Sequence, residues 1–127
     1  MRVLIVDDDA LAVRALARWV PDPAVAGSLD EGLRIVEQHR PIVAIFDRHF
    51  LGDPRTGTDA IRQVRAASPR SHVLIVTAHV DGRDQRRAIA AGAEGYFSKA
   101  DGEALRDAVE ALLDEDWSDG GVATALH

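Results

Sequence analysis

Short, unbroken runs of apolar residues recur along this chain of 127 residues and constrain its fold more than any other feature. The clearest runs are Val3–Val6, Ile42–Phe46, Val73–Val76 and Gly95–Ser98, with a shorter one at Ala24–Ala26. A strand buried on one face alternates apolar and polar residues, whereas a strand buried on both faces is apolar throughout. The runs therefore predict strands of a parallel sheet that is covered on both sides.

Segments with helical spacing separate the apolar runs. Four of them place apolar residues at i, i+3, i+4 and i+7, which forms one stripe along a helix. They are residues 12–19, 29–36, 57–64 and 105–112. In the first segment the stripe consists of Ala12, Ala15, Leu16 and Trp19. The segment 82–91 predicts a weaker helix, because Ala88 and Ile89 are almost alone on its apolar face.

Capping residues support these helices. Ser28 followed by Glu31 predicts a capping box at one helix start. Asp81 and Asp101 are predicted N-caps, and Gly92 suits the end of a helix. Strand and helix thus alternate five times, which predicts an α/β fold with a doubly wound parallel sheet.

Length and hydropathy set the domain organisation that we expect. Hydrophobic residues make up 46% of the chain, enough for a packed core, and the length suits one domain. We expect this domain to span residues 1–116 and residues 117–127 to form a tail or the start of a linker. No apolar run is long enough for a membrane helix or a signal peptide. We therefore expect a cytoplasmic protein that does not contact a membrane.

Charge and cysteine content exclude further classes of protein. The chain has no cysteine, which excludes disulfides and thiolate chemistry. Its net charge of −6 makes its surface a poor partner for nucleic acid. Of its 15 cationic residues only Lys99 is a lysine, and a compact ammonium suits different sites from the planar guanidinium of arginine.

Residues that can carry chemistry follow the predicted strands, and ligands of an open α/β sheet bind outside the carboxyl ends of its strands. The residues at those ends are Asp7-Asp8-Asp9, Asp47, Thr77 and Lys99. Clustered carboxylates repel one another unless a cation holds them, and oxygen ligands without cysteine suit Mg²⁺. The set predicts a phosphoryl-transfer site in which an aspartate oxygen can be the nucleophile.

On these residues the chain resembles the receiver domains of two-component response regulators. The resemblance covers about residues 1–115 and rests on four motifs, namely Val6-Asp7-Asp8, Asp47 after an apolar strand, Thr77-Ala78, and Tyr96-Phe97-Ser98-Lys99. It implies the flavodoxin-like strand order 2-1-3-4-5, with helices on both faces of the sheet. It also implies a phosphorylation-controlled signalling switch rather than an enzyme.

The resemblance implies a role for each aspartate of the site. Asp47 would accept a phosphoryl group from a histidine kinase or a phosphotransfer protein. Asp8 would bind Mg²⁺ directly, with Mn²⁺ as the alternative ion, and Asp7 would support the ion through water. The carboxylate of Asp47 and the backbone carbonyl of His49 would complete the protein ligands.

Further residues would respond to the phosphoryl group. Thr77 and Lys99 would bind its oxygens, and Tyr96 occupies the aromatic switch position, which turns inward as the threonine moves. His49 and His79 stand two residues after the phosphoacceptor and the threonine, at positions that tune dephosphorylation in the family. We expect these histidines to lie near each other and to make the phosphoryl lifetime depend on pH near about 6.5.

Besides the two histidines, two features depart from the family pattern. Ala100 follows the lysine where the family has a proline with a cis bond, so the Lys99–Ala100 bond is either trans or a strained cis bond. In the loop after the phosphoacceptor, the family's glycine is Gly57, about two residues late, and the usual proline near Leu51 is missing. We expect this loop to alter kinase choice or phosphoryl lifetime.

Two alternatives from other functional classes remain open. A degenerate receiver that docks partners without phosphorylation would fit Ala100 and the altered loop. A small phosphatase that resembles the haloacid dehalogenase family would use Asp7 and Asp9 as its Asp-x-Asp pair, but it would leave Asp47 unexplained.

The output surface that we expect consists of helix 82–91, strand 95–98 and the last helix. Tyr96 and Lys99 connect this surface to the site. A downstream protein partner would bind there, and the same surface is a candidate dimer interface. About a dozen residues follow the last predicted helix. We therefore expect either a stand-alone receiver or a regulator whose effector domain lies in a longer chain.

Overall fold

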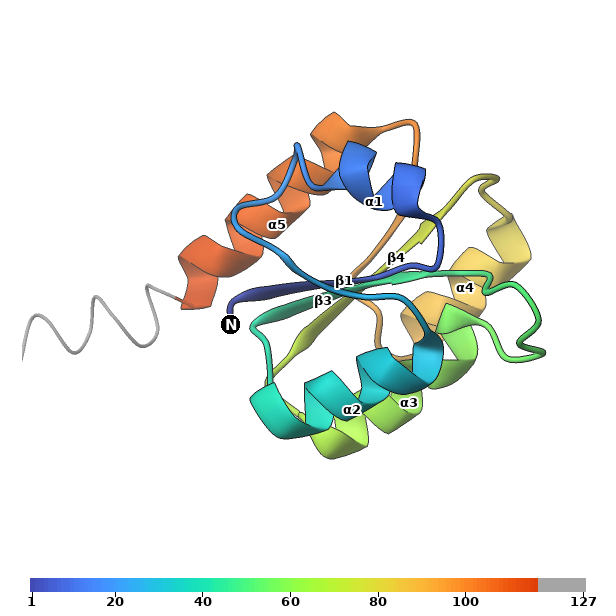
Figure 1. Cartoon of the computed structure of the whole chain (residues 1–127), viewed down its shortest axis with the longest axis horizontal. Helices are drawn as coiled ribbons and strands as arrows, with labels where there is room; N and C mark the ends of the chain where they lie inside the picture. The colour runs from blue at the N-terminus through green and yellow to red at the C-terminus, as the bar shows by residue number, and fades with distance from the viewer. Residues whose placement is uncertain (117–127) are drawn as a thin grey trace, which may run out of the picture.

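A five-stranded parallel sheet forms the centre of the molecule (Figure 1). The structure is a computed structural model and describes residues 1–116. The strands are β1 (Val3–Val6), β2 (Ala24–Ala26), β3 (Val43–Asp47), β4 (His72–Thr77) and β5 (Gly95–Ser98). Their order in the sheet is β2-β1-β3-β4-β5, and every neighbouring pair is parallel. The predicted doubly wound fold and strand order are confirmed.

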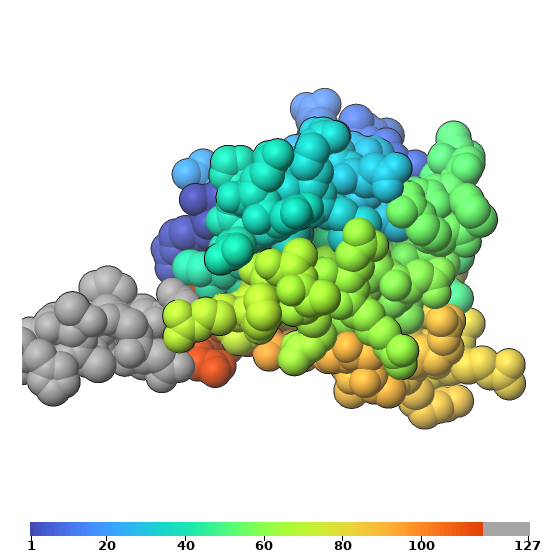
Figure 2. Space-filling model, turned by 90° about the horizontal axis from the view of Figure 1, so that it is seen from below, coloured from blue at the N-terminus to red at the C-terminus, as the bar shows by residue number. Residues whose placement is uncertain are grey.

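Helices cover both faces of this sheet. Their bounds are α1 (Ala10–Leu16), α2 (Leu29–His39), α3 (Gly57–Ala67), α4 (Gly82–Ala91) and α5 (Gly102–Asp116). Helices α1 and α5 lie on one face, and α2, α3 and α4 lie on the other (Figure 1). Seen from below, α2, α3 and α4 run side by side across their face (Figure 2). In the part of the chain that the structure describes, no helix has the length and hydropathy needed to cross a membrane.

The central strands are buried on both sides, as their unbroken apolar sequences predict. Leu4 and Phe46 face the α2–α4 side, whereas Ile5 and Ile45 face the α1–α5 side. All four side chains are fully buried. Alternate residues of one strand therefore belong to two separate cores, which is why neither face could tolerate polar residues.

Helix α1 is shorter than predicted, and its buried face is different. It ends at Leu16, so Trp19 lies beyond the helix and is partly exposed, and Ala15 is exposed. Val20 packs into the core instead. Residues 17–20 form turns and a bend after the helix, and Pro21 disfavours helical backbone at Val20.

Helix α4 also buries a different face from the predicted one. Ala88 is fully buried, but Ile89 is 49% exposed. The residue that shares the buried face with Ala88, one turn earlier, is Asp84, which is 3% exposed. An apolar count could not identify this face, because an aspartate occupies one of its positions.

The predicted caps are present, with one correction. Ser28 caps α2 by accepting a hydrogen bond from the backbone N–H of Glu31, but the Glu31 side chain accepts from Gly27 rather than from Ser28. The predicted box is therefore not closed there. A closed capping box is found instead at the start of α3, between Thr56 and Asp59.

The remaining predicted caps lie where the sequence places them. Asp81 accepts hydrogen bonds from two backbone N–H groups at the start of α4. Asp101 accepts one from Ala104 at the start of α5. Gly92 ends α4 with φ 117°, a left-handed conformation that favours glycine.

Candidate functional site

The carboxyl ends of four strands bring the candidate residues to one edge of the sheet. Asp7 directly follows β1, Asp47 is the last residue of β3, and Thr77 is the last residue of β4. Lys99 directly follows β5, and its backbone N–H donates to the carbonyl of Thr77 at 2.8 Å. The parallel register therefore places residues from distant parts of the sequence side by side.

Three carboxylates form a tight cluster at this edge. Asp7, Asp8 and Asp47 each offer an oxygen, and these oxygens all lie within 4.8 Å of one another. Asp7 and Asp47 are buried, whereas Asp8 is exposed. The Nζ atom of Lys99 lies 2.8 Å from Asp7 Oδ2 and 3.2 Å from Asp47 Oδ1. One lysine thus partly neutralises two buried acids.

This crowding changes the acidity of the site. Burial, followed by the negative charge of Asp7, raises the pKa of Asp47 to about 6 against the opposing effect of the Lys99 cation. Burial alone would lower the pKa of Lys99, but its contacts with Asp7 and Asp47 outweigh burial and raise it. At neutral pH the site therefore holds carboxylates beside one ammonium group.

The cluster fits a hard divalent cation. Apart from its ion pair with Lys99, the buried Oδ2 atom of Asp7 has no hydrogen-bond partner within residues 1–116. Three carboxylate oxygens outnumber the single cation, so the cluster has negative charge to spare. An all-oxygen donor set with one exposed member, Asp8, suits an ion that retains waters, as Mg²⁺ does.

The third aspartate of the run has a structural role. Asp9 caps α1 by accepting hydrogen bonds from the backbone N–H groups of Leu11 and Ala12. Its own N–H donates to Asp7 Oδ1 at 2.9 Å. The turn that starts the helix therefore also orients a carboxylate of the cluster.

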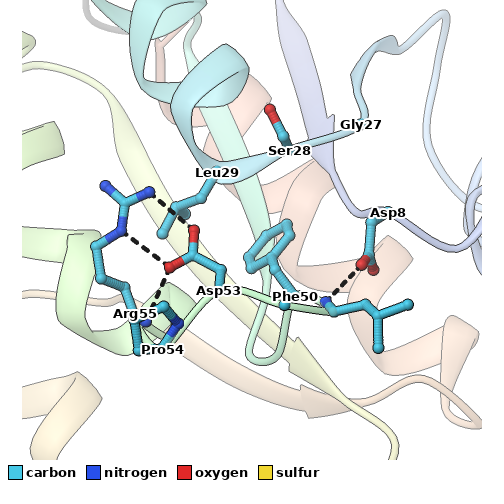
Figure 3. Close-up of a pocket in the computed structure, with 10 residues that line it drawn as sticks. Asp8, Gly27, Ser28, Leu29, Phe50, Asp53, Pro54 and Arg55 are labelled. Carbon is cyan, nitrogen blue, oxygen red and sulfur yellow. Dashed lines mark hydrogen bonds and ion pairs between the residues drawn. The ribbon is translucent and has the colours of Figure 1, made fainter.

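Asp8 joins the cluster to the loop that follows β3. The backbone N–H of Leu51 donates to Asp8 Oδ2 at 2.7 Å (Figure 3). Asp8, Phe50 and Asp53 are among the residues that line a cavity of about 460 Å³ beside this contact. Leu51 itself is 97% exposed, so its backbone and not its side chain connects the loop to the site.

The loop between β3 and α3 is braced at its base and against α2. His49 and Thr56 pair across its base in an antiparallel bridge, and Arg55 makes ion pairs with Asp53 and Asp30 at 2.8 Å. Gly57 closes the loop by donating its N–H to the Arg48 carbonyl. These contacts hold the loop between β3 and α3 in place.

Gly57 itself packs against the phosphoacceptor candidate. A Cβ atom placed on Gly57 would lie 2.2 Å from the backbone oxygen of Asp47. Only glycine allows this close approach of two backbones. Glycine at position 57 therefore lets the start of α3 pack against the end of β3.

A smaller cavity, of about 170 Å³, opens at Asp47. Besides Asp47 it is lined by Arg48, His49, Thr77, Ala78, His79 and Lys99. Both predicted rate-tuning histidines thus border the cavity that the carboxylate faces. Thr77 holds one wall in place, because its hydroxyl donates to the backbone oxygen of His79 at 3.1 Å.

Tyr96, unlike the other predicted site residues, lies outside both the carboxylate cluster and this cavity lining. It is buried, and its hydroxyl donates to Asp84 Oδ2 at 2.7 Å. Burial, followed by this hydrogen bond and the charge of Asp84, raises the pKa of Tyr96 to about 12. Tyr96 therefore links β5 to α4 through a buried carboxylate.

Sequence reasoning identified Tyr96 but missed Asp84 and its two other partners, Thr58 and Arg48. Asp84 Oδ2 also accepts a hydrogen bond from Thr58 at 3.0 Å and lies 3.1 Å from Arg48 Nε. The available signal was weak, because an aspartate among the arginines of α4 has the sequence pattern of a solvated helix face.

Ala100 stands where the family has a proline, but Lys99 still lies in the site. Residues 1–116 contain no cis peptide bond, so the Lys99–Ala100 bond is trans. The Lys99 ammonium nevertheless reaches both buried carboxylates. The missing proline therefore does not remove the cation from Asp47.

The model of the response regulator receiver domain family matches residues 3–110. The chain belongs to this family. Its members are signalling domains of two-component systems. The family match leaves the phosphatase alternative without support, and the receiver fold also accounts for Asp47 at the carboxyl end of β3.

Known relatives include larger regulators. The response regulator GacA of Pseudomonas aeruginosa is 30% identical over 118 residues, which cover 88% of this chain and 53% of that protein. A protein-glutamate methylesterase/protein-glutamine glutaminase of Cupriavidus pinatubonensis is 37% identical over 83 residues, or 61% of this chain and 24% of that protein. The chain thus spans about a quarter to a half of the relatives that it matches.

Solved structures share the fold. A CheY-like receiver domain protein of Methanospirillum hungatei aligns with a TM-score of 0.81 and 24% identity, over 94% of this chain and 98% of that one. A response regulator of Burkholderia pseudomallei, solved with a phosphorylated aspartic acid and a calcium ion, aligns with a TM-score of 0.73 and 21% identity. The alignment covers 96% of this chain and 74% of that one.

Proposed function

We propose that this receiver is a phosphorylation-controlled switch in which Asp47 accepts the phosphoryl group. The observation that carries the proposal is the position of Asp47, buried between Asp7 and Lys99 and open to the smaller cavity. Its pKa of about 6 leaves it ionised at neutral pH, as a nucleophile requires. The Burkholderia pseudomallei relative, which carries a phosphorylated aspartic acid, supports the same chemistry.

The donor that we propose is a histidine kinase or a phosphotransfer protein. A carboxylate oxygen of Asp47 forms a bond to phosphorus while the phosphorus–nitrogen bond of the donor breaks. The freed imidazole nitrogen then takes up a proton. Lys99 and Thr77 border the cavity and contact the phosphoryl oxygens, where they stabilise charge.

The resident metal of the proposed site is Mg²⁺, with Mn²⁺ as the alternative. Asp8 and Asp47 would bind it, with Asp7 through water and with the backbone carbonyl of His49. When bound, the ion supplies positive charge for the phosphoryl oxygens. The three carboxylates that cluster around a single ammonium group support a cation at this position.

The output surface that we propose is α4, β5 and α5, with Tyr96 as the switch residue. Tyr96 joins β5 to α4 through Asp84, and Lys99 joins β5 to the cluster. A downstream partner or an effector domain would bind this surface, and a second copy of the chain is a further candidate. The receiver unit that we propose is residues 1–116, with 117–127 as a tail or linker outside the described residues.

His49 and His79 are proposed to tune the phosphoryl lifetime. Both line the cavity at Asp47, where an imidazole changes access and charge for the attacking water. Because protonation adds a positive charge to an imidazole, the proposed role makes the phosphoryl lifetime depend on pH. A phosphoryl half-life that stays constant from pH 5.5 to 8 would refute this role.

A docking module that works without phosphorylation is the second candidate function. Ala100 and the braced loop, which depart from the family, favour it. The candidates differ in one outcome, because a docking module takes up no phosphoryl group. A phosphoacceptor takes up at most one per chain and does not turn over phosphate esters as an enzyme does.

Intact-mass spectrometry after incubation with Mg²⁺ and acetyl phosphate tests the proposal. We expect one added phosphoryl group, lost in Asp47→Asn and in a sample without divalent metal. Asp9→Asn is the matched control, because asparagine caps a helix as well as aspartate and Asp9 lies outside the cluster. A folded protein that gains no mass would overturn the phosphorylation proposal and leave the docking module.

A further inference from the structure

Arg48 stands between the candidate site and helix α4. It directly follows Asp47 and lines the same cavity as Asp47 and Lys99. Its Nε atom lies 3.1 Å from Asp84 Oδ2, and its Nη2 atom lies 3.7 Å from Asp81 Oδ2. One arginine therefore borders the carboxylate cluster and also reaches the first turn of α4.

Of the partners that contact Asp84 Oδ2, Arg48 is the one that makes no directed hydrogen bond to it. Asp84 Oδ2 already accepts hydrogen bonds from Tyr96 at 2.7 Å and from Thr58 at 3.0 Å. One carboxylate oxygen has about two lone-pair sites, and both are taken. Apart from the ion pair, the buried Nε of Arg48 has no hydrogen-bond partner within residues 1–116. Charge, without a directed hydrogen bond, therefore holds Arg48 at Asp84.

We propose that Arg48 is a phosphoryl-binding residue that leaves Asp84 for the phosphoryl group on Asp47 and so releases α4. The inference rests on the proposed function, which supplies the phosphoryl group. That group carries a charge of about −1.5 to −2 and offers three acceptor oxygens. The planar guanidinium matches two such oxygens at once, so Arg48 gains the directed hydrogen bonds that Asp84 does not provide.

The transfer of Arg48 has a consequence for α4. Asp84 is 3% exposed, and its other oxygen, Oδ1, has no hydrogen-bond partner in the described part of the chain. Without Arg48, its remaining cationic neighbour there is Arg87 on the same helix, with Nη1 at 3.7 Å from Oδ1. A buried carboxylate that loses a cation is unfavourable, so the first turn of α4 opens to water. Tyr96 bonds the same carboxylate, and the change therefore also reaches β5.

Two substitutions separate binding from packing. Arg48→Met removes the charge and keeps most of the apolar length, whereas Arg48→Lys keeps the charge and removes the planar fork. Arg55→Met is the matched control, because it removes an arginine–aspartate pair from the same loop without touching the smaller cavity. The probe is beryllofluoride with Mg²⁺, which mimics a phosphoryl group on a carboxylate.

Two measurements report the outcome, namely the affinity for beryllofluoride and the hydrogen exchange of the α4 backbone amides. In the unsubstituted protein we expect beryllofluoride to speed exchange in α4. In Arg48→Met we expect affinity about tenfold lower, because one charge-assisted hydrogen-bonded contact is lost. Exchange in α4 is then already fast without the probe and changes little when the probe binds.

The variants also distinguish a purely structural role. A structural Arg48 would change exchange in Arg48→Met but leave the affinity as it is, which would overturn the proposal. If Arg48→Met does not fold, Arg48→Lys decides. We expect it to keep slow exchange in the free protein but to bind beryllofluoride several-fold more weakly, and unchanged binding would overturn the proposal. An unsubstituted protein that takes up neither acetyl phosphate nor beryllofluoride would refute the proposed function itself.

Discussion

Two buried aspartates of this receiver have opposite surroundings, although each lies beside a cation. Asp47, at the end of β3, faces a second carboxylate and shares Lys99 with it. Asp84, in the first turn of α4, accepts hydrogen bonds from two neutral hydroxyl groups and lies beside Arg48. Asp47 opens onto a cavity, whereas Asp84 closes a contact between α3, α4 and β5.

The difference separates a carboxylate placed for chemistry from one placed for structure. Hydroxyl donors stabilise the charged form of a buried acid, whereas burial near another acid destabilises it. Asp47 accordingly has a pKa raised to about 6 and gains from any added cation. Asp84 is the acid whose removal leaves its partners unsatisfied. Removing the charge should therefore raise the free energy of unfolding at Asp47 and lower it at Asp84.

The largest expected effect is at Asp84. Asp84→Ala leaves the Thr58 and Tyr96 hydroxyls without their shared acceptor and Arg48 without its nearest carboxylate. We expect the free energy of unfolding to fall by about 3 kcal/mol. Urea unfolding followed by circular dichroism measures it, with Asp107→Ala on the exposed side of α5 as the control. A loss equal to that of the control would mean that Asp84 is not a structural acid.

A smaller loss is expected where the backbone supports Asp47. Gly57→Ala places a methyl group against the Asp47 carbonyl, at a position 2.2 Å from its oxygen, so β3 or the start of α3 must move. We expect a cost of about 2 kcal/mol, typical of overpacking, together with slower phosphorylation. Gly27→Ala is the matched control, because its Cβ would meet no atom nearer than 4.0 Å. Equal stability of the two variants would contradict the close contact.

Asp47→Asn should change the free energy of unfolding in the opposite direction to Asp84→Ala. It removes one of two like charges, so without divalent metal we expect stabilisation on the order of 1 kcal/mol at pH 7. The native pKa of about 6 lies above the ordinary aspartate value of 3.8, so the native state holds this proton more tightly. The stability contributed by Asp47 is therefore present below pH 4 and is lost as pH rises through 6.

Urea unfolding of both proteins from pH 4 to 8 measures this difference. The advantage of Asp47→Asn should grow as pH rises and level off above the native pKa. Added Mg²⁺ should reverse it, because the ion binds the cluster with Asp47 ionised. A difference between the proteins that does not depend on pH would contradict the raised pKa.

The smallest effect concerns the ionisation of Tyr96, whose hydroxyl donates a hydrogen bond to Asp84. Tyr96 is the single tyrosine of the chain, so absorbance at 295 nm follows its ionisation alone. We expect a pKa near 12 and a partial fall toward 10 in Asp84→Asn, because burial remains while the charge is lost. Since the native pKa is raised, the stability that this phenol contributes is lost as pH rises from 10 through 12. A pKa of 10 in the unsubstituted protein would contradict the buried hydrogen bond.

Strand sequences were predictable because both faces of the central strands are buried. A run such as Val3–Val6 must then be apolar at every position, and β1 coincides with its predicted range. The position of Asp47, Thr77 and Lys99 at one edge was also predictable, because the carboxyl ends of parallel strands lie at the same edge of the sheet. Helix faces were harder, as the corrections at Trp19 and Ile89 show, because one helix contacts the sheet through only a few residues.

The amino-acid sequence by itself determined the order of strands and helices, the ends of the buried strands and the chemical set of carboxylates, threonine and lysine. Local periodicity and turn chemistry carry this information. Only the tertiary structure decided that Asp84 is buried and that Arg48 joins it to the site. Both depend on how α4 packs against β5 and the loop after β3. From sequence alone a charged side chain is predicted to be exposed to solvent. Its burial becomes favourable only when compensating groups from distant parts of the chain lie beside it.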